Sequence, residues 1–479
     1  MLLYARLHLR DIVNISYGGL VWNLSFCLLF VCTCFGSSVG ADEKHVETLK
    51  PFQCVGVEWL ASRKRALLAD EPGLGKTAQA IVAAELIGAK SILVITKASL
   101  IHNWADEFDK WSLNFQPQVA LPKRGYVNHD CITSYDNYWR HPERFNPAPD
   151  VLILDEAHAV KSVSSKRTKA IYGPGGVARH AKHVWALTGT PMRNDPTELY
   201  PHYMLLCEAR HGRSDWPRDL MGFTRRFCIT NKVYLAGRTV EKIVGSKNEE
   251  QLRGICDTFM LRRTKEQVMT ELGKINYDTL TVMVEGVKHN AEYLAAESFL
   301  RDGGSAETLL PQEDSLAAYR RQLGVAKAQA LMPILWERFV SGNDKVVLFA
   351  HHKDTVAALM KWLDDVLVEG YAVSITGDTP NTVRHEAVGK FQNDPACRVF
   401  VGSITAAGEG ITLTAAHDVV IVEPSWVPAD NAQAISRCHR IGQKKPVFAY
   451  FVVAYADRVD KLVTKALISK SAMINKVME

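Results

Sequence analysis

The chain has 479 residues, of which 47% are hydrophobic and 23% are charged, and it carries no acidic or basic tail. This composition is that of a globular protein, and the length exceeds what one hydrophobic core usually supports, so we expect two domains. A net charge of +5 permits nucleic-acid binding without requiring it. None of the ten cysteines forms a Cys-x-x-Cys pair, which argues against a structural zinc and favours buried thiols in a reducing compartment.

The first 41 residues form an apolar leader. No charged residue lies between Ile12 and Ala41, the run Leu20–Phe35 is strongly apolar, and Arg6 and Arg10 precede it. Such a segment is either a signal peptide or membrane anchor, or the product of a mis-assigned start codon. It is set apart from the fold prediction for the remaining chain.

From residue 42 onward, short apolar runs alternate with helix-like segments, which is typical of βαβ units and parallel sheets. The strands expected in the first half are Arg65–Ala69, Ser91–Thr96, Val151–Asp155 and Val184–Thr188. The strands expected in the second half are Lys345–Ala350, Ala372–Thr376, Val399–Gly402, Val419–Glu423 and Val447–Val453.

Two polar stretches separate the halves, as expected of a surface loop or lobe boundary. They are Arg301–Ser305 and Pro311–Asp314. The pattern therefore predicts an α/β protein with two related lobes, each a mostly parallel sheet flanked by helices, and a cleft between them. The expected boundaries are 42–275 for lobe 1, 276–325 for a connector and 326–479 for lobe 2.

A glycine-rich loop follows the first expected strand. Gly73, Gly75, Lys76 and Thr77 lie between the apolar run 66–69 and a helix-like alanine-rich segment. This strand, loop and helix order is typical of a phosphate cradle, in which backbone N–H groups hold a polyphosphate, Lys neutralises it and Thr binds Mg²⁺. Asp70 stands where the general pattern has glycine, and a simple turn is the alternative.

An acidic pair ends the third expected strand. Asp155 and Glu156 come directly after Val151–Leu154 and precede His158. One carboxylate can hold a metal ion while the second orients and deprotonates a water molecule. Together with the glycine-rich loop, this pair indicates nucleoside triphosphate hydrolysis.

A basic segment near the end of the chain is the candidate contribution of the second lobe. Arg437 and Arg440 are three residues apart, which places them on one face of a helix. Two guanidinium groups aimed at one point would stabilise charge on a γ-phosphate in transit. A solvated basic helix face explains this segment alone equally well.

These motifs resemble, in order, those of the SNF2 group of superfamily 2 helicase-like ATPases, over nearly everything from Leu49 to Tyr455. Lys97 stands where the family usually has proline, and Asp70 is in the family pattern. The matching segments are Leu49–Gln53 (glutamine motif), Asp70–Thr77 (I), Leu93–Trp104 (Ia), Asp155–His158 (II), Leu187–Pro191 (III), Leu261–Lys265, Val347–His352 (IV), Ser403–Leu413 (V) and Gln433–Gln443 (VI). The chain looks most like the compact annealing-helicase branch and its microbial or viral relatives.

The resemblance implies two RecA-like lobes with ATP in the cleft between them, and it assigns a role to each matched residue. Lys76, Asp155, Glu156, Arg437 and Arg440 would be catalytic, with Thr77 and Asp155 on Mg²⁺. The residues expected to bind ATP are Gln53, Gly73, Gly75, Lys76, Thr77 and Gln433, with Gln53 reading adenine. The residues expected to couple the ATP and DNA sites are Thr188, Gly189, Thr190, Gly408 and Gly410, for which ordinary strand-end turns are the alternative.

Other conspicuous side chains have plainer interpretations. Adjacent residues on a strand face opposite sides, so His351 and His352 are not expected to chelate a metal. The pairs Arg262–Arg263 and Arg320–Arg321 either contact phosphates or are solvated surface charge. Trp59, Trp104, Trp185 and Trp426 are expected in the core.

The resemblance implies an ATP-driven translocase that moves on double-stranded or forked DNA without reading its sequence and remodels DNA or protein–DNA complexes. The alternatives are a strand-separating DNA or RNA helicase, a nucleic-acid-binding scaffold that hydrolyses nothing, and a membrane-tethered ATPase. We expect no structural zinc, an intracellular location in a nucleoid, nucleus or viral-host cytoplasm rather than a membrane, and dependence on a separate targeting protein.

Overall fold

The computed structural model describes residues 16–17, 20–21, 49–120, 130–192, 195–235, 238–269, 275–304, 306, 309, 316–340, 344–366, 370–407 and 411–477. The chain divides into two compact units, one comprising Met1–Asp70 and Gly75–Arg262 and the other comprising Glu71–Leu74 and Arg263–Glu479. Apart from the short strands β1 (Ser16–Tyr17) and β2 (Leu20–Val21), the apolar leader lies outside the described residues. No helix in the described ranges is long and apolar enough to cross a bilayer.

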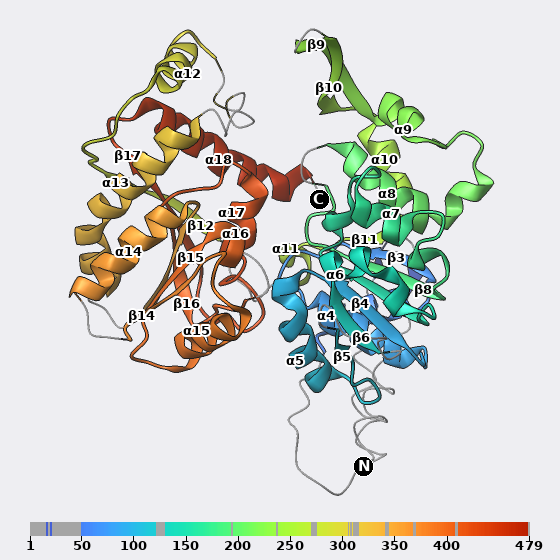
Figure 1. Cartoon of the computed structure of the whole chain (residues 1–479). Helices are drawn as coiled ribbons and strands as arrows, with labels where there is room; N and C mark the ends of the chain where they lie inside the picture. Colours follow the sequence, from blue (N-terminus) through green and yellow to red (C-terminus); the bar gives the residue numbers. More distant parts are fainter. Residues whose placement is uncertain are drawn as a thin grey trace, which may run out of the picture. The chain divides into compact units, whose positions relative to one another are not determined.

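The first unit is built on a seven-stranded sheet in the order β11-β3-β8-β7-β4-β6-β5, and every neighbouring pair is parallel (Figure 1). Its central strands are buried on both faces, as expected of a parallel sheet covered by helices. The strands are β3 (Arg65–Leu68), β4 (Ile92–Thr96), β5 (Gln118–Val119), β6 (Cys131–Ser134), β7 (Val151–Asp155), β8 (His183–Leu187) and β11 (Met260–Leu261).

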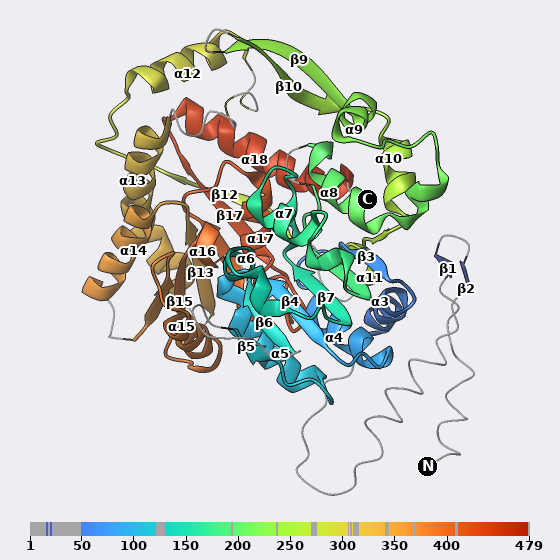
Figure 2. The ribbon, with the colours of Figure 1, turned by 45° about the vertical axis from the view of Figure 1, so that its right-hand side comes forward.

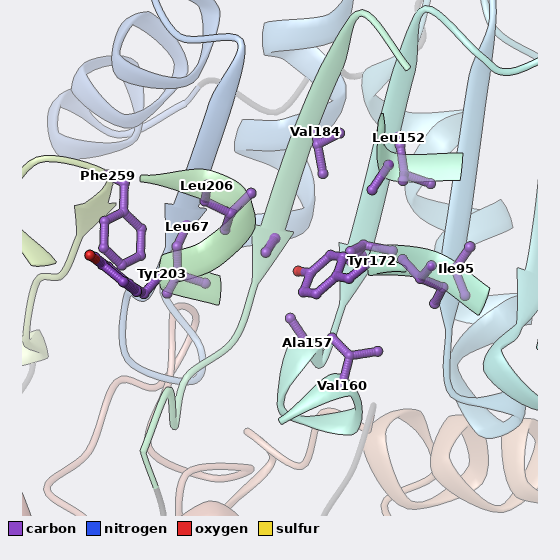
Figure 3. Packing of buried hydrophobic residues seen from close by; sticks show 14 of the residues in the cluster. Leu67, Ile95, Leu152, Ala157, Val160, Tyr172, Val184, Tyr203, Leu206 and Phe259 are labelled. Carbon is purple, nitrogen blue, oxygen red and sulfur yellow. The ribbon is translucent and has the colours of Figure 1, made fainter. Parts of the chain in front are cut away.

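Alternation along these strands divides the core of the first unit into two layers. Leu152 and Leu154 of β7 join one hydrophobic cluster, whereas Val151 and Ile153 join the other. Helices α3 (Pro51–Ala61), α4 (Lys76–Leu86) and α5 (Ile101–Trp111) cover the second cluster. The first cluster is covered by α6 (Tyr135–Arg140), α7 (Lys166–Tyr172), α8 (Tyr200–Leu206), α9 (Leu220–Phe227) and α10 (Glu249–Cys256), and part of it is shown in Figure 3.

An antiparallel ribbon extends from the first unit between α9 and α10. It consists of β9 (Cys228–Leu235) and β10 (Arg238–Ser246), with an irregular register between Ile243 and Gly245 (Figure 2). Among the described residues these two strands pair only with each other. The sequence analysis did not predict this ribbon.

The second unit has a six-stranded sheet in the order β12-β17-β16-β13-β15-β14, again with all neighbours parallel. The strands are β12 (Asn276–Val282), β13 (Lys345–Ala350), β14 (Ala372–Ile375), β15 (Val399–Ser403), β16 (Ala416–Ile421) and β17 (Phe448–Ala454). Strand β12 falls within the segment 276–325 that the sequence pattern suggested as a connector.

Helices cover both faces of the second sheet (Figure 1). One face carries α13 (Ala317–Leu335) and α14 (Lys353–Val366), and the other carries α15 (Asn381–Asn393), α16 (Ile404–Ala407) and α17 (Pro428–Ile435). A further cluster joins α12 (Ala291–Arg301), α13 and α18 (Arg458–Val477). The short helix α11 (Lys265–Val268) and a π-helical turn at Trp336–Val340 complete the elements.

The predicted fold class is confirmed: the chain is an α/β protein with two RecA-like lobes, each a parallel sheet flanked by helices. Each strand expected between Arg65 and Val453 is present to within three residues at either end. The largest offset is in β16, which was expected over Val419–Glu423 and is found over Ala416–Ile421. The boundaries proposed for the lobes remain a prediction.

Candidate active site

The glycine-rich loop connects β3 to α4, as the sequence order predicts. Gly75 has a φ of +72° and precedes the first residue of α4, which places backbone N–H groups at the start of that helix. A Cβ atom built on Gly75 would lie 2.2 Å from Nε2 of Gln53. The left-handed backbone therefore favours glycine at position 75, and a larger residue would also displace the amide of Gln53.

Lys76, in the first turn of α4, lies among acidic groups. Its Nζ donates a hydrogen bond to the backbone carbonyl of Asp70 at 2.6 Å. Burial lowers the pKa of Lys76 below its ordinary value, while the charges of Glu156, Asp70 and Asp155 act in the opposite direction. A polyphosphate beside this ammonium group would favour its charged form further, as a phosphate-binding lysine requires.

Asp155, the last residue of β7, is held by two donors from neighbouring elements. Nε1 of Trp104 donates to its Oδ2 at 2.7 Å, and the hydroxyl of Thr96 donates to the same oxygen at 2.9 Å. Burial, reinforced by the charge of Glu156, raises the pKa of Asp155 to about 6. The two described donors share Oδ2, which leaves Oδ1 for a metal ion or a metal-bound water.

Trp104 is therefore more than the core residue that the sequence predicted. Its side chain is fully buried in α5, and a buried indole N–H normally has an acceptor. The sequence gave no sign that this acceptor is the metal-binding carboxylate, because 51 residues separate the two positions.

Glu156 has backbone angles of φ 49° and ψ 49°, a left-handed conformation that is uncommon for a residue other than glycine. Its Oε2 lies 3.2 Å from Nδ1 of His158, which in turn lies 3.3 Å from the hydroxyl of Thr188. Burial opposes ionisation of Glu156, but the hydrogen bond and charge of His158, with Lys97 and Lys76, hold its pKa below the ordinary value. Glu156 therefore stays ionised near neutral pH and can orient a water molecule.

Gln53 lies near the start of α3 and is almost completely buried. Its Oε1 accepts a hydrogen bond from the backbone N–H of Lys50 at 2.8 Å, so the side chain also caps its own helix. The adenine-reading role predicted for Gln53 stays a prediction.

Thr188, Gly189 and Thr190 follow β8 and lie beside the acidic pair. The hydroxyl of Thr188 accepts a hydrogen bond from the backbone N–H of Thr190 at 3.1 Å in addition to its contact with His158. Nη1 of Arg262 donates to the carbonyls of Ala69 and Gly189, at 3.0 and 3.3 Å. These bonds connect the end of β3 with the loop after β8.

Of the two alternatives left open for the paired arginines, solvated surface charge does not hold for three of the four, and phosphate contact stays a prediction. Arg262 bonds two carbonyls of the first unit, Arg263 is buried, and Arg320 is buried with its Nη2 on the carbonyl of Pro424 at 3.1 Å. Only Arg321 is exposed, where it pairs loosely with Asp354. The sequence pattern could not separate these cases because adjacent arginines point in different directions.

In the second unit, helix α17 contains Gln433 and ends at Ile435. Arg437 and Arg440 lie in the turns that follow, so the prediction that they share one face of a helix is wrong. Gly442, in the turns that follow, has a φ of +97°, a left-handed backbone that a continuing helix would not contain. Arg437 is 6% exposed, which also excludes a solvated basic face at that position.

Backbone contacts fix this arginine segment to the loop after α16. The carbonyl of Arg437 accepts a hydrogen bond from the N–H of Leu413 at 3.0 Å, and Nη1 of Arg440 donates to the carbonyl of Ile411 at 3.2 Å. Nε2 of Gln443 donates to three carbonyls, those of Thr414, Ala416 and Cys438. The predicted coupling residues Gly408 and Gly410 lie outside the described residues.

Mg²⁺ usually takes one or two protein oxygens and completes its octahedron with phosphate and water. The hydroxyl of Thr77 and the carboxylate of Asp155 are of the type this ion prefers, and Thr77 stands in the first turn of α4. Among the described residues no group of three or more His, Cys, Asp or Glu side chains could hold a metal by themselves. The residues present therefore fit a metal that arrives with a nucleotide.

A glycine-rich loop with Lys and Thr, followed across the sheet by an adjacent Asp and Glu, defines a nucleoside-triphosphate-binding lobe. Comparison with known families gives a more specific result. Residues 52–295 match the SNF2-related domain, and residues 326–442 match the helicase conserved C-terminal domain. The chain belongs to the SNF2-related family, as the sequence motifs predicted.

The similar curated proteins are considerably longer than this chain. It is 31% identical over 450 residues to the Drosophila melanogaster "SWI/SNF-related matrix-associated actin-dependent regulator of chromatin subfamily A-like protein 1", covering 91% of the chain and 57% of that protein. It is 29% identical over 435 residues to the Bos taurus "DNA annealing helicase and endonuclease ZRANB3", covering 85% of the chain and 38% of that protein. The chain thus spans about half the length, or less, of these relatives.

Among solved structures, the Sulfolobus solfataricus SWI2/SNF2 ATPase core in complex with dsDNA is 22% identical, with a TM-score of 0.42. That match covers 89% of this chain and 92% of the other. The Sulfolobus solfataricus SWI2/SNF2 ATPase core domain is 21% identical, with a TM-score of 0.41 and 93% coverage of both chains.

Proposed function

We propose that this chain is an ATP-driven motor that moves along double-stranded DNA and remodels DNA or protein–DNA complexes. The observation that carries the proposal is the arrangement at the end of β7. Asp155, whose carboxylate can bind a metal ion, and the ionised Glu156 are adjacent there. Lys76 and Thr77 belong to the same unit. Membership of the SNF2-related family supports the same conclusion.

The chemistry proposed for the first unit follows from the charges it holds. Lys76 and the N–H groups at the start of α4 bind the phosphates of ATP, while Thr77 and Asp155 hold Mg²⁺. Glu156 orients the attacking water and accepts its proton, and His158 stabilises the orientation of that carboxylate through the 3.2 Å contact. Gln53 is proposed to accept adenine.

The groups of the first unit do not by themselves neutralise the charge that develops on the γ-phosphate. We propose that Arg437 and Arg440 supply this charge from the second unit, with Gln433 as a further nucleotide contact. Hydrolysis would then require the two units to close on the nucleotide, and DNA that favours the closed state would stimulate turnover. Thr188, Gly189 and Thr190 would transmit that state, with Gly408 and Gly410 as their proposed counterparts.

The proposed track is duplex or forked DNA bound through its phosphates. One relative is named a DNA annealing helicase and another a regulator of chromatin. One similar core was solved in complex with dsDNA. Phosphate contacts carry no base sequence, so we expect sequence-independent binding that weakens steeply with salt. The proposed setting is inside a cell, where ATP and DNA are both present, with a separate protein for targeting.

The test is the rate of ATP hydrolysis by the chain with no nucleic acid, single-stranded DNA, duplex DNA, forked DNA or RNA. Lys76→Ala is the inactive reference, and Lys110→Ala, at an exposed lysine of α5, is the matched control. Stimulation by duplex or forked DNA that is lost only in Lys76→Ala is expected. Stimulation by RNA alone, or strand release from a labelled duplex without reannealing, would instead favour a strand-separating helicase.

A different result would favour a scaffold that binds DNA without hydrolysing ATP. It would bind duplex DNA and ATP but show the same negligible turnover as Lys76→Ala with every polymer. Intact Lys76, Glu156, Arg437 and Arg440 predict against that result.

A further inference from the structure

The turn at Asp155–Ala157 has an unusual backbone conformation that neighbouring groups must stabilise. Glu156 occupies the left-handed region, and such a residue keeps its conformation only where surrounding groups fix it. Within the turn, the N–H of Ala159 donates to the carbonyl of Glu156 at 2.9 Å. This local bond fixes one carbonyl and leaves that of Asp155 to be held by another element.

The carbonyl of Asp155 is bound by a tyrosine from α6. The hydroxyl of Tyr135 donates to it at 2.8 Å, and the side chain is 3% exposed. Burial, with the nearby Tyr172, Asp155 and Glu156, raises the pKa of Tyr135 well above its ordinary value. The hydroxyl therefore keeps its proton and remains a donor at every pH at which the protein is folded.

The carbonyl of Ala157 lies near a fully buried histidine of α8, but it accepts no hydrogen bond from Nε2 of His202, which has no hydrogen-bond partner among the described residues. Burial lowers the pKa of His202 to about 4, with His158 acting in the same direction. The Nδ1 atom lies 3.1 Å from the hydroxyl of Tyr172, and the two rings meet edge to face at 5.7 Å. His202 is thus neutral, and Tyr172 at the end of α7 orients its ring.

Figure 3 shows Tyr172 beside Ala157 and Val160, within the same hydrophobic layer as Leu152. These polar contacts are enclosed by apolar side chains, so water does not substitute for a lost partner. The three elements α6, α7 and α8 therefore each contribute one polar side chain behind the turn that carries Glu156.

We propose that Tyr135, here called the motif II brace, is a positioning residue that holds Glu156 in its left-handed conformation and so sets its aim at the attacking water. The inference rests on the proposed ATP hydrolysis. The Tyr135 side chain does not touch the reacting atoms, because it acts through the backbone carbonyl of Asp155.

The first test is DNA-stimulated ATP hydrolysis by the full chain, with kcat and KM measured separately. Tyr135→Phe is expected to lower kcat about tenfold and to change the KM for ATP by less than about twofold, because the aim of Glu156 matters only in the transition state. The matched control is Tyr138→Phe on the same helix. Tyr138 is equally buried at 3% exposed and packs on Phe145, and the control is expected to keep kcat within about twofold.

The brace should affect turnover only through Glu156, and this gives a readout that a general structural defect would not reproduce. In a Glu156→Gln background, Tyr135→Phe is expected to cause no further loss of the residual turnover. A second readout avoids turnover and reports on Asp155, whose carbonyl Tyr135 binds. Tyr135→Phe should raise the Mg²⁺ concentration for half-maximal binding of a fluorescent ATP analogue about threefold, and Tyr138→Phe should not.

Wild-type kcat and unchanged Mg²⁺ dependence in Tyr135→Phe would overturn the brace. An equal loss in Tyr138→Phe, or a full further loss in the Glu156→Gln background, would overturn it as well by indicating a packing effect. If the unsubstituted chain hydrolyses no ATP with any polymer, the proposed function fails instead, and the Mg²⁺ titration still decides whether the brace positions motif II.

Discussion

The acidic pair of the first unit differs from the buried acids that have a basic partner. In the second unit, Lys327 donates to Asp460 at 2.6 Å and His352 bonds Glu423, and in the first unit Lys161 donates to Glu198. In the first unit, Asp155 and Glu156 are two acids placed side by side at one strand end. Paired buried charges maintain a fold, whereas adjacent like charges are kept where a cationic ligand is expected.

The pKa values of Glu423 and Asp155 shift in opposite directions, although burial also raises the pKa of the paired Asp460. Burial would raise the pKa of Glu423, but the hydrogen bond and charge of His352, with Arg320, hold it below its ordinary value. The pKa of Asp155 instead rises to about 6 because burial and the charge of Glu156 act together. Binding of Mg²⁺ would offset the repulsion between the two carboxylates. We therefore expect the first unit to become more stable when the metal and nucleotide bind.

The largest expected effect comes from removing one member of the like-charge pair. Glu156→Gln should lower kcat for DNA-stimulated ATP hydrolysis about 1,000-fold while keeping ATP and DNA binding, since a charge is lost without a change of shape. Removing that charge should also lower the pKa of Asp155 below about 6 and strengthen Mg²⁺ binding at pH 6. Glu107→Gln, on α5, serves as the control, and ATP turnover at the parent rate in Glu156→Gln would show that the base is assigned wrongly.

The next effect tests the paired charges of the second unit. Lys327→Met should lower the free energy of unfolding by about 3–5 kcal/mol, because Asp460 remains buried without its cation and the carbonyl of Val452 loses a donor. The shift of the urea midpoint measures this change. Lys327→Met combined with Asp460→Leu should recover most of the loss, and a double variant as unstable as the single one would contradict the pairing argument.

A third prediction concerns the donor that Trp104 gives to Asp155. Losing this donor disfavours the charged carboxylate, so Trp104→Phe should raise the pKa of Asp155 above about 6. Because protons and Mg²⁺ compete for the carboxylate, the acid limb of Mg²⁺-dependent nucleotide binding should move up by about one pH unit. The control is Trp185→Phe, which removes an equally buried indole that donates to the carbonyl of Arg63. In this variant the acid limb of Mg²⁺-dependent nucleotide binding should stay at the same pH.

The smallest effect is expected from an exposed ion pair on the same helix as Lys327. Arg321 lies on α13, as Lys327 does, but its pair with Asp354 is 3.6 Å long, with both side chains more than half exposed. Arg321→Ala should change the free energy of unfolding by less than about 0.5 kcal/mol in the same urea measurement. A loss comparable with that of Lys327→Met would mean that burial does not decide the strength of these pairs.

Sequence reasoning succeeded where the chemistry lies in consecutive residues. Lys76 with Thr77, and Asp155 with Glu156, stand at strand ends in the order that a parallel sheet requires, so their elements could be placed directly. It failed at Arg437 and Arg440, because the spacing of three residues was taken for a helix that ends at Ile435. The β9–β10 ribbon was missed too, since its strands belong to neither central sheet.

The sequence by itself determined the α/β class, the family and the acidic and glycine-rich motifs, because alternating apolar runs and short motifs are local properties of the chain. Only the tertiary structure showed that Trp104 and Tyr135 bond Asp155 of motif II, from positions 51 and 20 residues away along the chain. Hydrogen bonds of this kind depend on how helices pack against a sheet. That packing is set by many buried side chains together, and no spacing within the sequence encodes it.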